Sequence, residues 1–153
     1  MPKIDIASAP EKKGSGYPVP FHERSQNRIK KALGDAAGLS DYGVNLVRLP
    51  PGEWSSQRHW HSHEDEFVYV LSGELTLITD AGRALLKAGD CGGFAKGVAD
   101  GHHFINEGRE PAVYLEVGTR SKDDACTYPD IDLKVSNIDD IYRHKDGRPY
   151  PKR

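Results

Sequence analysis

Three histidines and a glutamate fall within eight residues of one stretch, 52–73, and constrain the fold more than any other feature. Alternate side chains of a strand point to the same face, so His59 and His61 share a face and Trp60 takes the other. Glu66 follows after a short bend. Two imidazoles and a carboxylate that approach from adjoining segments provide three ligands of a divalent-metal site.

Short apolar segments separated by Gly, Pro and Asp predict an all-β sandwich or barrel. The barrel core is expected to span 44–120, after an N-terminal arm at 1–43 that contains a helical turn or two in 25–33. A C-terminal tail, 121–153, is expected to pack over the barrel or reach a neighbouring subunit. The predicted strands are 44–49, 54–61, 67–71, 74–79, 84–87, 91–95, 102–106 and 111–117.

The length of 153 residues suits one domain with its own core. The formal net charge of −2 provides no electrostatic footprint for nucleic acid or for an anionic membrane, so neither is an expected partner. The N-terminus has no apolar run that would predict a signal peptide or a spanning helix. The two cysteines, Cys91 and Cys126, are expected to be free thiols in a cytoplasmic protein.

The histidine stretch resembles the first cupin motif: a Gly, a later His-x-His, four residues, a Glu, six residues and a Gly. The residues that match it are Gly52, His59, His61, Glu66 and Gly73. The second cupin motif has a Gly-Asp turn, a Pro-x-Gly, a His and an Asn four residues later. Its counterparts are Gly89-Asp90, Ala95-Lys96-Gly97, His102 and Asn106. Ala95 replaces the usual Pro, and the loop before His102 is two residues longer than in the family pattern.

The resemblance implies a double-stranded β-helix, which is a small jelly-roll barrel with a metal inside its mouth. It makes His59, His61, Glu66 and His102 the ligands of one divalent ion: Zn, Fe, Mn or Ni. The chain is most similar to small bacterial single-domain cupins that share a late segment, here Tyr128 to Leu133. Some of that group are labelled sugar-phosphate isomerases, and cupins of this size are often homodimers.

Two alternatives concern the register of the ligands. A slip of one residue would exchange His102 with His103, which is otherwise expected to face away. The histidine pair could also be His61 and His63, although Glu66 would then follow too closely. His63, Glu64 and Asp65 are expected to be surface residues of the bend.

Further residues are candidates for contact with a substrate. Gln57 shares the face of His59 and His61, and a structural hydrogen bond explains it equally well. Cys91 could line the cavity, although a small buried side chain is the simpler interpretation. The three cations that could meet an anionic substrate are Arg58, Lys96 and Arg109. The aromatic side chains expected to wall the barrel and contact substrate are Phe94, Phe104 and Tyr114.

The ligand set favours a metal-dependent enzyme that acts on a small polar or anionic metabolite, isomerase-like by resemblance. An isomerase needs a general base, and the sequence assigns no residue to that role. A first alternative is an Fe(II) dioxygenase-type cupin, in which the ion holds substrate and O₂ side by side. A second is a module that binds a small molecule without turnover, and a third is a structural cupin with an incidental metal.

Overall fold

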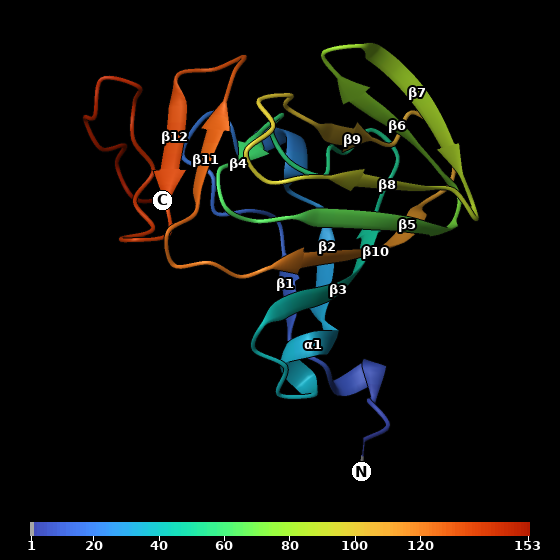
Figure 1. The fold of residues 1–153 in the computed structure, drawn as a ribbon. Coiled ribbons are helices and arrows are strands. Elements are labelled where there is room, and N and C mark those ends of the chain that lie inside the picture. Colours follow the sequence, from blue (N-terminus) through green and yellow to red (C-terminus); the bar gives the residue numbers. More distant parts are fainter. Residues whose placement is uncertain (1) are drawn as a thin grey trace.

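Six antiparallel strands form the larger sheet, in the order β1-β2-β3-β10-β5-β8, in the computed structural model, which describes residues 2–153 (Figure 1). Two three-stranded sheets, β7-β6-β9 and β12-β11-β4, lie against it. A bridge between His59 and His102 connects the smaller sheets beside β4 and β9. The architecture is a double-stranded β-helix, as predicted.

Most strands begin and end near the Gly, Pro and Asp turns of the sequence. Their bounds are β1 Glu11–Lys13, β2 Ile29–Ala32, β3 Tyr42–Leu49, β4 Trp60–His61, β5 Glu66–Ser72, β6 Glu74–Thr79, β7 Gly82–Lys87, β8 Cys91–Phe94, β9 His103–Ile105, β10 Ala112–Thr119, β11 Ala125–Tyr128 and β12 Leu133–Ser136. The helical segments are short: η1 Ile6–Ser8, η2 Glu23–Ser25 and α1 Leu33–Ala36.

Alternation along β5 places the core inside the barrel. Val68 and Val70 are buried, whereas Phe67, Tyr69 and Leu71 are exposed on the outer face of the sheet. The buried valines belong to one apolar cluster with residues of β3, β6, β7, β9 and β10, namely Val47, Leu49, Leu75, Leu86, Phe104, Ala112 and Tyr114. This cluster forms the apolar core of the barrel.

The helical turns predicted in 25–33 are only partly present. The 3-10 turn η2 ends at Ser25, and the following residues extend into β2, which pairs with β3. Lys30 lies opposite Val47 in this pairing, and β1 in turn pairs with β2. Sheet pairing with β3 therefore overrides the weak local helical pattern.

The strand predicted at 54–61 is reduced to the two residues of β4, with isolated bridges at Trp54 and His59. Between these bridges, the Ser55 N–H donates to the Phe104 carbonyl on β9, and side chains of the N-terminal region bind other backbone groups. Ser25 Oγ donates to the Trp54 carbonyl at 2.9 Å, and the Gln57 N–H donates to the Tyr17 hydroxyl at 3.2 Å. These bonds satisfy the backbone of the stretch without a regular ladder.

The C-terminal residues form the hairpin β11–β12, on the side of the barrel away from the β6–β7 hairpin (Figure 1). Strand β11 pairs with β4, where Cys126 lies opposite His61 and Thr127 opposite Trp60. The rings of Tyr128 and Tyr17 meet edge to face at 5.8 Å, which attaches the hairpin to the N-terminal segment. The hairpin thus lies directly beside the histidine stretch.

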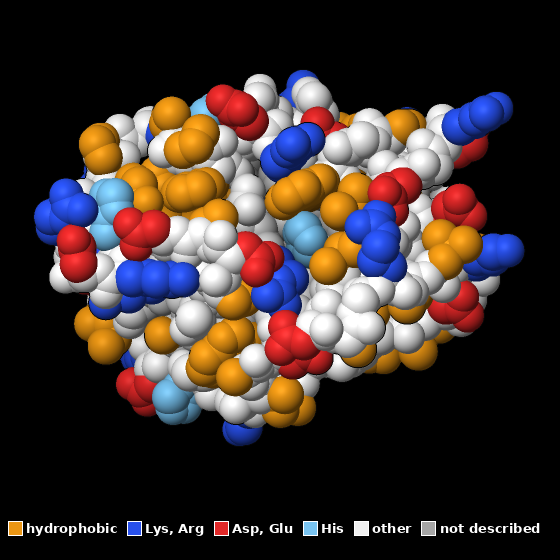
Figure 2. Space-filling view, turned by 90° about the horizontal axis from the view of Figure 1, so that it is seen from above, with side chains coloured by type: hydrophobic (Ala, Val, Ile, Leu, Met, Phe, Trp, Pro, Cys, Tyr) orange, Lys and Arg blue, Asp and Glu red, His pale blue; other side chains and the backbone are white. Residues whose placement is uncertain are grey.

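Lysine, arginine, aspartate and glutamate side chains are interspersed over the face seen from above, between small apolar groups (Figure 2). Neither sign of charge forms a stripe over this face. Within residues 2–153, none of the helices has the length and apolar character required to span a bilayer.

Asn106 connects the end of β3 to the turn before β10, and we expect its replacement by alanine to be strongly destabilising. The side chain is fully buried; its Nδ2 donates to the carbonyls of Leu49 and Glu110, and its Oδ1 accepts from the Gly108 N–H. Asn106→Ala leaves these backbone groups unpaired and should lower the free energy of unfolding by about 2–4 kcal/mol.

Urea denaturation measures this effect. The control variant Asn27→Ala alters an exposed side chain and should change stability by less than about 0.5 kcal/mol. Equal stability of the Asn106 variant and the parent would contradict the assigned role.

Candidate metal centre

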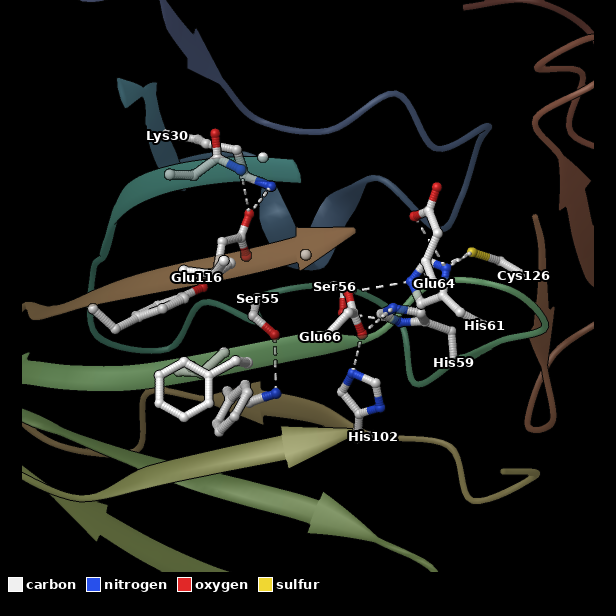
Figure 3. Close-up of a pocket in the computed structure, with 18 of the residues that line it drawn as sticks. Lys30, Ser55, Ser56, His59, His61, Glu64, Glu66, His102, Glu116 and Cys126 are labelled. Carbon is white, nitrogen blue, oxygen red and sulfur yellow. Dashed lines mark hydrogen bonds and ion pairs between the residues drawn. The ribbon is translucent and has the colours of Figure 1, made fainter. Parts of the chain in front are cut away.

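The four predicted ligands meet in the mouth of the barrel (Figure 3). His61 lies on β4, Glu66 begins β5, and the bridge to His102 holds His59 in place. The Glu66 carboxylate lies at the centre of the cluster. Its Oε1 is 3.1 Å from His61 Nε2, and its Oε2 is 2.5 Å from His102 Nε2 and 3.6 Å from His59 Nε2.

Hydrogen bonds on the far side of two rings fix their tautomers. His59 Nδ1 lies 2.8 Å from the Gln57 carbonyl, and His61 Nδ1 lies 2.6 Å from Asp124 Oδ2. Because a carbonyl and a carboxylate can only accept, each Nδ1 carries the proton. In the neutral rings, the Nε2 lone pairs therefore point toward Glu66.

This donor set fits a divalent cation. Lone pairs of His59 and His61 and the carboxylate of Glu66 face one another, and all of them are acceptors. Glu66 Oε2 is buried and, within residues 2–153, has no partner with hydrogen-bond geometry. The ligand atoms of these three residues lie within 4.8 Å of one another. Imidazole and carboxylate ligands suit Zn, Fe, Mn and Ni.

The electrostatics of the cluster agree with this assignment. Burial raises the pKa of Glu66, but interactions with His102, His59 and His61 outweigh burial and hold the pKa well below its usual value. Burial likewise lowers the pKa of His61, but hydrogen bonds to Cys126 and Glu66 more than offset it and raise the pKa to about 12. Without a metal ion, the ionised carboxylate therefore holds a proton on the His61 ring, and a divalent cation bound at Glu66 would replace that proton.

The structure distinguishes the two adjacent histidines. The His102 ring stacks on Phe94, with centroids 3.6 Å apart, and directs Nε2 at Glu66. His103 instead packs edge to face on Trp54, and its Nδ1 lies 2.9 Å from the Ser56 carbonyl. His63, from the alternative pair, is exposed in the bend.

The other predicted residues fall in different places. Phe104 and Tyr114 line the cavity beside the cluster, whereas the Gln57 amide is turned away and donates to the Phe21 carbonyl at 2.9 Å. Cys91 is exposed on β8, so neither a cavity position nor a buried position is correct for it. The Arg58 guanidinium donates hydrogen bonds of 2.6–2.8 Å to the carboxylates of Asp130 and Asp80, which compensate its charge.

A cavity of about 350 Å³ opens beside the cluster. Several of its lining residues come from segments that sequence reasoning assigned to the arm, the bend and the tail: Arg28, Lys30, Glu64 and Cys126. Figure 3 shows Lys30 and Glu116 on one side of this pocket and the histidines on the other.

Asp124 and Glu64 lie on the Nδ1 side of the His61 ring, opposite the side that faces Glu66. Asp124 is fully buried, and its two oxygens accept from His61 Nδ1 and from the His63 N–H. Glu64, predicted to lie on the surface, is half-buried; its Oε1 accepts from the Ser121 N–H and from Asn137 Nδ2, and its Oε2 lies 3.7 Å from His61 Nδ1. No local pattern could have identified Asp124, because it lies 63 residues from His61 in the chain.

Comparisons with known proteins agree with this architecture. Residues 45–118 match the family model described as a cupin domain. A structure of a sugar phosphate isomerase from a cupin superfamily, from Silicibacter pomeroyi DSS-3, is 42% identical with a TM-score of 0.92, covering 98% of this chain and 97% of that one. A structure from Acidithiobacillus ferrooxidans is 36% identical with a TM-score of 0.68, covering 80% of this chain and 74% of that one.

A curated relative, the oxalate decarboxylase OxdC of Bacillus subtilis, is 37% identical over 144 residues. The alignment covers 86% of this chain but only 35% of OxdC, so the chain spans about a third of that relative. The similarity to OxdC therefore concerns one part of a longer protein.

Proposed function

The chain belongs to the cupin superfamily, and on that basis we propose that it is a metal-dependent enzyme acting on a small polar or anionic metabolite, with sugar phosphates as the first candidates. The observation that carries the proposal is the convergence of three Nε2 atoms on the Glu66 carboxylate at the edge of an open cavity. His59, His61, Glu66 and His102 would hold one divalent ion. The sugar phosphate isomerase from Silicibacter pomeroyi, similar over nearly its full length, supports this choice of substrate.

The bound ion would act as a Lewis acid on a carbonyl or hydroxyl oxygen of the substrate. An isomerase also requires a group that moves a proton between neighbouring carbons, and Glu64 is the candidate. It lines the cavity, and both of its hydrogen bonds go to Oε1, which leaves Oε2 on the side of His61. Phe94, stacked on His102, and the buried Phe104 provide apolar walls beside the cluster.

A screen of aldose and ketose phosphates with Zn, Mn, Fe or Ni tests the proposal. We expect the parent to interconvert at least one pair, and Glu64→Gln to lower kcat by about 100-fold or more while metal content is unchanged. Glu53→Gln alters a half-buried carboxylate that does not line the cavity and accepts hydrogen bonds from Asn27, and it should retain activity. Background turnover with every metal would rule out the isomerase.

Two alternatives remain open to test. An Fe(II) dioxygenase-type cupin needs no protein base, and the similarity to OxdC makes small carboxylates worth including in an oxygen-uptake screen. A non-catalytic binding module would return its ligand unchanged.

The expected homodimer and cytoplasmic location stay predictions. The exposed Phe67, Tyr69 and Leu71 on β5 provide an apolar face for a second copy.

A further inference from the structure

Strand β2 directs two cations into the barrel. Lys30 lies opposite the buried Val47, which pairs in turn with the buried Tyr114 on β10. Arg28 precedes β2 and lies two residues from Lys30, so alternation places it on the same inward face. Arg28 is only 9% exposed, and both cations line the cavity beside the histidine cluster.

The two cations differ in how their charge is compensated. Lys30 forms an ion pair with Glu116, whose Oε1 also accepts from Asn45 Nδ2. Arg28 donates to the backbone carbonyls of Ser55 and Gly14. Among residues 2–153, its Nε has no hydrogen-bond partner, and no carboxylate lies within salt-bridge distance of the guanidinium. A buried charge without a counterion costs several kcal/mol, so an anion at this place would be stabilising.

A second donor without a partner lines the same cavity. Tyr114 is 1% exposed and, in the described part of the chain, its hydroxyl forms no hydrogen bond, although buried tyrosines normally do. Burial raises the pKa of Tyr114, so the phenol keeps its proton and remains a donor. Tyr114 lies on β10 two residues from Glu116, which places it on the β2 side of the cavity.

We propose that Arg28 and Tyr114 form an oxyanion subsite, which binds the phosphate or carboxylate group of a small metabolite. The opposite end of that metabolite would face the cluster of His59, His61 and Glu66 across the cavity. This inference deepens the proposed function and rests on it for the orientation of the ligand, although anion binding itself does not require the metal. Guanidinium groups bind phosphate and carboxylate through paired, charge-assisted hydrogen bonds, and a phenol adds a further donor.

Isothermal titration with inorganic phosphate and with acetate tests the subsite, on both metal-loaded and chelator-treated protein. The parent is expected to bind at least one of these anions saturably. Tyr114→Phe and Arg28→Met should each weaken that binding by about tenfold or more, because each removes a buried donor. The control Lys96→Met removes an exposed positive charge that does not line this cavity and should bind as the parent does.

Preference for phosphate would indicate a phosphate ester as substrate, and preference for acetate a carboxylate; both support the subsite. Tyr114→Phe removes an oxygen that has no partner and should fold at least as stably as the parent, so the test does not depend on the folding of Arg28→Met. Absence of saturable binding to either anion would overturn the proposal, as would unchanged affinity in the Tyr114 variant. Anion binding by a chain that takes up no divalent metal when Zn, Mn, Fe or Ni is supplied would support the subsite while contradicting the proposed metal enzyme.

Discussion

Protein purified without an affinity tag is expected to contain about one divalent metal ion per chain, and the double variant His59→Ala/His61→Ala is expected to contain none. These imidazoles supply two of the four ligands, and their protonated Nδ1 atoms leave Nε2 free for the ion. Elemental analysis measures the effect, and it also identifies the metal. Iron would favour the dioxygenase alternative, whereas Zn, Mn or Ni would favour the isomerase.

His63→Ala is the matched control for this experiment. His63 lies two residues from His61 but is exposed in the bend, with its Nδ1 beside Ser62 Oγ. The control should retain the metal content of the parent. Loss of metal from the control would support the alternative pair His61 and His63. A metal-free parent, or a folded double variant that retains its metal, would contradict the site.

The strands of the barrel could be predicted from the sequence because their signals are local. Leu75 and Leu77 alternate with Glu74 and Thr76, and a turn at Gly73 precedes them, so the pattern predicts the strand, although Thr76 is buried as well as Leu75. The stretch 54–61 does not form a regular strand: its backbone meets the β9 segment only at separate points, and other backbone groups bond to the side chains of Ser25 and Tyr17. Contacts between segments distant in the sequence decided that region, and a local pattern does not contain them.

The candidate site also combines residues with a local sequence signal and residues placed by contacts between distant segments. The spacing of His59, His61 and Glu66 is local, and the structure brings them together with His102. Arg28 could not be linked to the cavity in advance, because its position depends on the pairing of β2 with β3. The polar tail likewise showed no periodic pattern, although it contributes the buried carboxylate behind His61.

Asp124→Asn is expected to weaken metal binding by about 10- to 100-fold while the fold is retained. Asp124 has two donors to satisfy, His61 Nδ1 and the His63 N–H, and it uses one carboxylate oxygen for each. Asparagine keeps the shape but offers only one acceptor, so either the tautomer of His61 or the backbone of the bend loses its partner. A carboxylate behind a ligating imidazole also raises the basicity of the ring, and the amide removes that negative charge.

Competition with a metal-binding dye measures this change without reference to turnover, and the absorption of a Co²⁺-loaded protein reports the ligand geometry. Asp130→Asn is the control, because it alters an aspartate of the same C-terminal segment that pairs with Arg58 outside the cluster. The control should bind metal as the parent does, even if its stability falls slightly. Unchanged metal affinity in a folded Asp124→Asn protein would show that the C-terminal hairpin packs on the barrel without tuning His61, whereas a selective loss would make the hairpin part of the metal centre.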